Sequence, residues 1–142
     1  MVVRSRNKHK KMDVIQIIAK CIIFLFGLFL VYAGFLMLFK PEKVRAIIGK
    51  AGSTYFINYA ELISRLLIGI CFVITSKATN WELYFKTFGY FLIVSAILLM
   101  CVPIKTHHNF AKNAANKLKP IYLKICTPFS ILIGVLIVLA LK

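Results

Sequence analysis

Three polar side chains interrupt one apolar stretch of the chain. Asn58, Glu61 and Arg65 fall at i, i+3 and i+7 within FINYAELISRLLIGICFVITSK, so they share one face of a helix. If that helix begins near Phe56 and crosses a hydrocarbon core of about 30 Å, Arg65 lies roughly 13 Å deep and Glu61 roughly 7 Å deep. An unpaired charge at such a depth costs at least about 2.5–3.5 kcal/mol. The i,i+4 spacing lets the acid and the base pair, and we predict that they do.

This intramembrane polar stripe, Asn58, Glu61 and Arg65, has two interpretations. It could be a substrate, proton or ion site, because ionisable residues inside a membrane commonly mark such sites. It could instead be a structural ion pair that fixes helix packing. Under either interpretation the stripe is expected to face other helices or a water-filled crevice, because lipid offers it no partner.

The other side chains that could do chemistry are two histidines and four cysteines. His107 and His108 are adjacent, so on a helix they point about 100° apart and cannot chelate one metal ion. We predict an interfacial polar pair that faces headgroups; a pH-sensitive contact with lipid or a partner is the alternative. The cysteines fall one per apolar run, and no phosphate loop or nucleophile–base pair appears. The sequence therefore predicts no metal and no cofactor, and it leans away from an enzyme.

The elements that carry these residues are apolar helices. Hydrophobic residues make up 61% of the 142 residues, which is too apolar for a water-soluble fold. The pattern predicts an all-α integral membrane four-helix bundle with spans at about 14–39, 56–77, 83–102 and 121–141. Residues 1–12 are predicted to be a disordered basic tail, and residues 13–142 a single domain. Met12 is an alternative start, which leaves the tail itself open.

Two basic segments between the spans begin at proline. PEKVRAIIGKAG from Pro41 and the segment after Pro103 place apolar residues on one face and lysines on another, so two short interfacial amphipathic helices are expected. FGLFL at 26–30 matches FGYFL at 88–92, and the same spacing pairs Pro41 with Pro103. LLIG at 66–69 matches ILIG at 131–134 after a slip of three residues. These matches suggest a 2+2 parallel repeat with both long loops on one side of the membrane.

The charge of the chain favours a membrane partner. A net charge of +15, placed mostly outside the apolar runs, fits the lipid bilayer and its anionic headgroups better than nucleic acid. A membrane-protein partner or a homo-oligomer is also expected. The bias towards Ile, Lys, Asn and Phe suggests a bacterial source, and hence a multi-pass protein of the inner (cytoplasmic) membrane. Lys and Arg divide evenly between the two sides if the chain starts at Met1, so the positive-inside rule leaves the orientation open. A start at Met12 would favour cytoplasmic long loops.

Several segments carry a resemblance. INYAELISR, VPIKTHH and KPIYLKICTPFS together resemble small four-span bacterial membrane proteins, a family that implies no particular reaction. LFLVYAGFLMLFKP and YAELISRLLIG are also similar to the first two spans of DoxX-like proteins. That resemblance implies a four-helix fold and, for some members, a subunit of quinone-linked sulfur oxidation.

Three functions follow as hypotheses. The first is a non-enzymatic accessory or partner subunit of the inner membrane. The second is a DoxX-like quinone- or redox-linked membrane subunit. The third is a small transporter in which Glu61 binds a cation or a proton.

Overall fold

The fold is built from helices alone. The computed structural model describes residues 2–141, and side chains from residue 12 onward. Within this part of the chain there are six helices and no strand, which confirms the all-α prediction. The helices are α1 (Val2–Phe39), α2 (Pro41–Gly49), α3 (Tyr55–Ser76), α4 (Glu82–Cys101), α5 (Ile104–Lys117) and α6 (Pro120–Ala140). Four of them contain stretches long and apolar enough to cross a membrane: Met12–Phe39, Tyr55–Ser76, Glu82–Cys101 and Pro120–Ala140.

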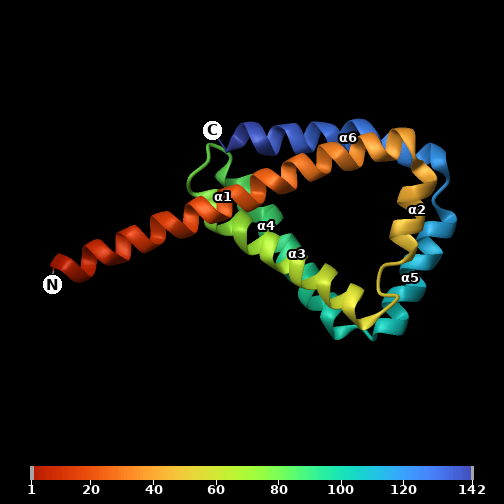
Figure 1. Ribbon diagram of the computed structural model, residues 1–142, viewed down its shortest axis with the longest axis horizontal. Helices are drawn as coiled ribbons and strands as arrows, with labels where there is room; N and C mark the ends of the chain where they lie inside the picture. The colour runs from red at the N-terminus through yellow and green to blue at the C-terminus, as the bar shows by residue number, and fades with distance from the viewer. Residues whose placement is uncertain (1, 142) are drawn as a thin grey trace.

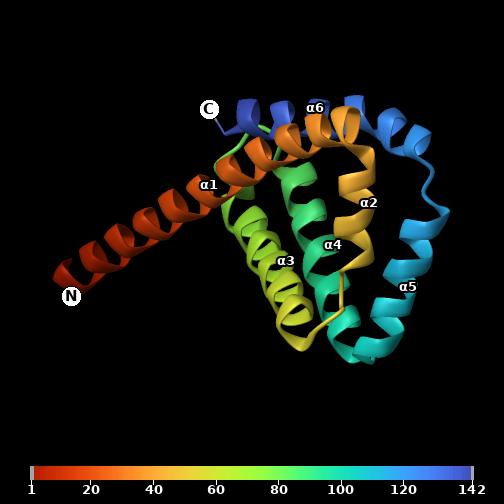
Figure 2. The same cartoon turned by 45° about the vertical axis from the view of Figure 1, so that its right-hand side comes forward.

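The four long helices form two packed pairs. Each pair is called a hairpin below, although only α3 and α4 are consecutive in the chain. Helix α1 packs against α6, and α3 packs against α4. The hairpins meet at the end that holds the chain turn between α3 and α4, and they diverge towards the other end (Figure 1). There α2 and α5 pack against each other and bridge the gap, as the second view also shows (Figure 2). The molecule is therefore a V closed by a short helical pair.

The two halves of the chain repeat this arrangement. Helices α1 and α4 end at Phe39 and Cys101, which are 62 residues apart, the spacing of the FGLFL and FGYFL motifs. Helices α3 and α6 begin at Tyr55 and Pro120, 65 residues apart, the spacing of LLIG and ILIG. Each hairpin joins one helix from each half, and α2 packs on its counterpart α5. This pairing is what a two-fold repeat requires, and it supports the 2+2 parallel repeat.

Glycines from the repeated motifs bring each hairpin together. A Cβ placed on Gly134 of α6 would lie 2.6 Å from the carbonyl oxygen of Gly27 in α1. A Cβ on Gly69 of α3 would lie 2.9 Å from the carbonyl oxygen of Gly89 in α4. Gly27 and Gly89 are the glycines of FGLFL and FGYFL, and Gly69 and Gly134 those of LLIG and ILIG. Small residues permit close backbone approach between helices in lipid, so both hairpins cross at the same repeated pair.

The buried core lies where the hairpins meet. The ring of Phe72 on α3 has centroid distances of 6.0 Å to Phe26 and 5.1 Å to both Phe85 and Phe88. The buried members of this cluster are Ala19, Ile23, Cys71, Phe72, Phe85 and Ile137. Large apolar side chains elsewhere on the long helices are widely exposed, as expected where the solvent is lipid.

Two boundaries differ from the sequence prediction. Helix α1 begins at Val2, so the segment predicted to be a disordered tail is helical and projects beyond the other helices (Figure 1). The first 26 residues contain no Gly or Pro, and Lys and Arg are good helix formers, so a helix propagates back from the apolar span. The second basic segment, expected from its pattern to be helical over residues 104–119, forms α5 only as far as Lys117, before Pro120 starts α6.

The bridging pair is tied together by one arginine. Arg45 of α2 donates from Nε to the carbonyl oxygen of Ala115 at 3.1 Å. That carbonyl is one of the last four of α5, which have no partner within their own helix. Arg45 also forms a 2.8 Å ion pair with Glu42. The predicted interfacial helices are thus packed on each other as well as placed between the spans.

Candidate functional site

The predicted acid–base pair is formed. Nη2 of Arg65 donates to Oε1 of Glu61 at 3.0 Å, along one face of α3. The two side chains keep 31% and 30% of their surface accessible. Only one carboxylate oxygen and one guanidinium nitrogen are used, so the pair retains acceptors and donors for a further partner.

The pair opens into a cavity between the two hairpins. This inter-hairpin cavity has a volume of about 600 Å³. It is contributed by α1, α3 and α4, and its polar lining is Glu61, Ser64, Arg65 and Ser95. The remaining walls are mostly phenylalanine. Its full lining is Phe26, Phe29, Glu61, Ser64, Arg65, Ile68, Phe88, Phe91, Leu92 and Ser95.

The phenylalanine walls come from equivalent positions of the repeat. Phe26 and Phe29 of FGLFL correspond to Phe88 and Phe91 of FGYFL, so both motifs line the same cavity. A cavity lined by both copies of a motif lies at the interface of the two halves. Repeat interfaces are where many membrane proteins of repeated architecture bind their ligands.

The charged pair breaks this symmetry. The positions of α6 that correspond to Glu61 and Arg65 are Cys126 and Ser130, 65 residues later. Ser130 donates from Oγ to the carbonyl oxygen of Leu30 at 2.8 Å, which ties α6 to α1. One half of the molecule therefore uses this face for packing, and the other half presents an acid and a base to the cavity.

Asn58 does not join the pair. Its side chain is 7% exposed, and Oδ1 lies 2.8 Å from Nδ1 of His107. With the amide in this orientation, the histidine Nδ1–H donates to the asparagine oxygen. The polar stripe thus divides into a buried hydrogen bond near the start of α3 and the accessible pair Glu61–Arg65 farther along the helix.

The expectation that both histidines face headgroups is wrong for His107. That residue is 7% exposed, because the turn before α3 lies across α5 at this point. Gly52, with φ of +67°, takes a conformation that favours glycine, and a Cβ there would meet Nδ1 of His107 at 3.1 Å. His108 donates from Nδ1 to the carbonyl oxygen of Ala51 at 3.0 Å. His107 therefore fastens α5 to the first turn of α3, and His108 fastens it to the turn before α3.

The sequence analysis missed the residues that α4 adds to the cavity. Ser95 faces the cavity, although its Oγ donates within α4 to the carbonyl oxygen of Leu92 at 2.9 Å. Phe88 and Phe91 line the same cavity as Phe26 and Phe29. The repeated FGxFL motif was the signal that could have placed these phenylalanines together.

The residues that line the cavity offer one acid–base pair within aromatic walls. No group of three His, Cys, Asp or Glu side chains in the described residues could hold a metal ion. Glu61 is the only acid among the residues that line the cavity, and no histidine lines it. Aromatic walls with one donor–acceptor pair can hold a molecule that has an apolar body and a polar end.

No protein-family model, no curated protein and no solved structure matches this chain.

Proposed function

We propose that this protein is a non-enzymatic subunit of the bacterial inner membrane that binds an amphiphilic molecule in its inter-hairpin cavity. The observation that carries the proposal is the Glu61–Arg65 pair, which is about 30% accessible within a cavity whose apolar walls are mostly phenylalanine. The accessible part of the pair is what a bound molecule can contact, because the 3.0 Å contact uses only one carboxylate oxygen and one guanidinium nitrogen.

The hydrogen-bond donors and acceptors that the Glu61–Arg65 contact leaves unused suggest the class of ligand. Arg65 can donate hydrogen bonds to a carbonyl or phenolic oxygen, and the unused Oε2 of Glu61 can accept one from a hydroxyl group. Phe88 and Phe91 supply flat surfaces for an aromatic ring. A quinone head has these groups, with carbonyls when oxidised and hydroxyls when reduced. The resemblance to DoxX-like proteins, some of which are quinone-linked, agrees with this class.

Thermal unfolding of the detergent-purified protein with a short-chain benzoquinone tests the proposal. A ligand at 100 times its dissociation constant stabilises the folded state by about 2.7 kcal/mol, so Tm should rise in a saturable way. Arg65→Met should abolish that rise. Lys86→Gln, which removes an exposed cation outside the cavity lining, should retain it. An equal rise in Tm for all three proteins would mean that the quinone partitions into the micelle without a site.

A transporter that uses Glu61 is the second candidate, since the carboxylate faces the cavity. It requires Glu61 to exchange Arg65 for a cation during each cycle. Proteoliposomes that take up a cation with wild-type protein but not with Glu61→Gln would favour it over the binding subunit. Quinone-dependent stabilisation without any uptake would favour the binding subunit.

A further inference from the structure

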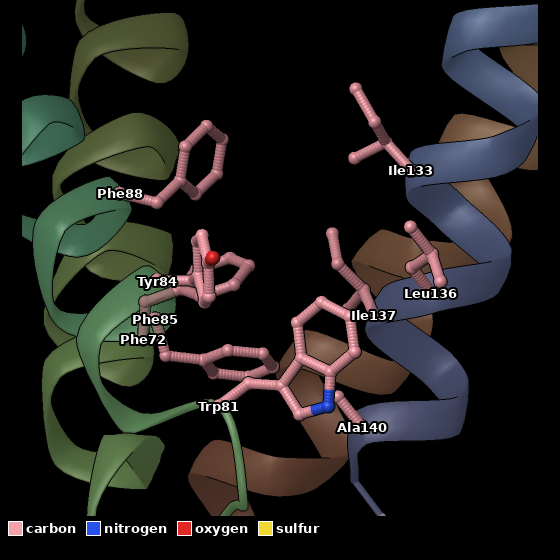
Figure 3. Close-up of a pocket in the computed structure, with 9 residues that line it drawn as sticks. All are labelled: Phe72, Trp81, Tyr84, Phe85, Phe88, Ile133, Leu136, Ile137 and Ala140. Carbon is pink, nitrogen blue, oxygen red and sulfur yellow. The ribbon is translucent and has the colours of Figure 1, made fainter.

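A second cleft lies between α4 and α6, near the end where the hairpins meet. Figure 3 shows aromatic side chains on one wall and the aliphatic side chains of α6 on the other. The cleft has a volume of about 260 Å³. It is lined by Phe72, Trp81, Tyr84, Phe85, Phe88, Ile133, Leu136, Ile137 and Ala140.

The repeat explains why this cleft is open. Helices α4 and α6 correspond to α1 and α3, which pack against each other directly. Trp81 and Phe85 correspond to Ala19 and Ile23, which are 2% and 0% exposed in the closed seam. The partner positions in α3 include Phe72, which is 1% exposed there.

Side chains of α6 remain accessible in the α4–α6 cleft, whereas the equivalent contact between α1 and α3 is closed. Ile133 and Leu136 of α6 keep 47% and 37% of their surface exposed. Bulky rings at Trp81 and Tyr84 replace the small and aliphatic residues that let α1 approach α3. At equivalent positions of the repeat, the molecule therefore has a closed α1–α3 contact and an open α4–α6 cleft.

The polar and charged residues at the opening of the α4–α6 cleft indicate which kind of molecule would fill it. The indole N–H of Trp81 and the hydroxyl of Tyr84 are the polar groups of its side chains, and such rings settle at the headgroup level of a bilayer. Lys77 and Lys86 flank Trp81 in sequence, with Glu82 as the acid between them. Basic residues near the surface attract anionic lipid by about 1 kcal/mol each.

From these observations we infer that the α4–α6 cleft is a binding site for one acyl chain of an anionic phospholipid. The chain lies between the phenylalanines of α4 and the aliphatic side chains of α6. The headgroup lies beside Trp81 and the exposed lysines that flank it in sequence, Lys77 and Lys86. This site is separate from the inter-hairpin cavity, although Phe88 lines both, and it does not depend on the function proposed for Glu61 and Arg65.

Trp81 makes the inference directly testable, because it is the only tryptophan in the chain. We would reconstitute the full-length protein in phosphatidylcholine vesicles and add phosphatidylglycerol brominated near the carboxyl end of its acyl chains, which quenches nearby tryptophan. Quenching should saturate at low mole fraction. It should exceed that by equally brominated phosphatidylcholine about fivefold, the factor that corresponds to the attraction of one lysine.

A matched pair of variants controls the measurement. Ile133→Phe narrows the cleft and should remove the saturable phase. Leu132→Phe changes a neighbouring residue that is 56% exposed and does not line the cleft, so it should leave quenching unchanged. Circular dichroism verifies that both variants remain helical; if Ile133→Phe does not fold, Leu136→Phe takes its place.

Two results would overturn the inference. One is quenching that follows the bulk mole fraction of brominated lipid for both headgroups and ignores Ile133→Phe. The other is loss of quenching as the protein-to-lipid ratio rises, since a second copy of this chain would then occupy the cleft.

Discussion

At the residue scale, the account depends on how incompletely Glu61 and Arg65 satisfy each other. One 3.0 Å contact joins a group with two acceptor oxygens to a group with five donors. In a cavity with phenylalanine walls, neither the rings nor lipid chains can supply hydrogen-bond partners for the remaining atoms of the pair. A polar molecule that enters the cavity therefore gains contacts that it could not find elsewhere in the bilayer.

A double-mutant cycle measures the coupling free energy between Glu61 and Arg65. Glu61→Gln leaves Arg65 unpaired in apolar surroundings, and Arg65→Met leaves the carboxylate unpaired. Each should destabilise the protein by up to about 3 kcal/mol, while the double variant should lose less than the sum. Reversible unfolding in mixed micelles gives these values. The Glu42–Arg45 pair, in which Glu42 is 68% exposed, is the matched control and should couple by less than about 1 kcal/mol. Additive losses at Glu61 and Arg65 would show that the pair does not form.

The buried bond between Asn58 and His107 gives a second prediction. Asn58→Leu leaves the Nδ1–H of His107 without an acceptor in a site that is 7% exposed, so it should cost about 1–3 kcal/mol. His108→Ala removes a partly buried bond to Ala51 and should cost less. Thermal melts in detergent compare the two variants. A smaller loss for Asn58→Leu than for His108→Ala would contradict the assignment of the buried bond.

At the element scale, glycines fix the distance between the helices of each hairpin. The two crossings use equivalent glycines, and a methyl group added to Gly134 or Gly69 would strike backbone oxygen as well as a neighbouring side chain. Backbone cannot shift without opening the hairpin. The hairpins are therefore held by close approach of the main chains, as is common for helix pairs in lipid.

Gly134→Ala and Gly69→Ala test this packing. The new Cβ atoms would lie 2.6 Å and 2.9 Å from carbonyl oxygens, so each variant should lose about 1–3 kcal/mol of stability. Gly49→Ala is the control: its nearest contact is an ordinary 3.5 Å to the Cβ of Ala115. Alanine favours a helix more than glycine does, so this control should be neutral or slightly stabilising. Equal losses of stability at all three positions would indicate that alanine is unfavourable at any of these glycines. They would then give no evidence for close helix crossings at Gly134 and Gly69.

Part of the structure could be predicted from the sequence, because hydrophobicity and spacing act locally. The four spans follow from the lengths of apolar runs, the starts at Pro41 and Pro120 from the fixed φ of proline, and the Glu61–Arg65 pair from its position on one helix turn. The burial of His107 could not be predicted, because it depends on how the turn before α3 lies across α5. The inter-hairpin cavity likewise depends on the V-shaped divergence of the hairpins, which no local pattern encodes.

At the scale of the whole molecule, the repeat determines which features share a side of the membrane. The two hairpins form the arms of the V and meet near the turn between α3 and α4 (Figures 1 and 2). Helices α2 and α5 close the opposite end. If the long helices span the bilayer, α2 and α5 lie together at one surface. The turn between α3 and α4 then lies at the other.

Cysteine labelling tests this sidedness. With the four native cysteines replaced by serine, Ser53→Cys in the turn between α2 and α3 and Asn113→Cys in α5 should react with a membrane-impermeant maleimide from the same side. Asn80→Cys, in the turn between α3 and α4, should react only from the opposite side. All three positions are exposed. Reaction of Ser53→Cys and Asn113→Cys from opposite sides would rule out the parallel repeat in the membrane.

The most direct test of the central claim is photolabelling with an azido-substituted benzoquinone in membranes, followed by peptide mass mapping. The account predicts adducts concentrated on the cavity walls, in residues 26–29, 61–68 and 88–95, and loss of those adducts in Arg65→Met. Adducts spread evenly over the lipid-facing surfaces of the four long helices, unchanged in Arg65→Met, would contradict it.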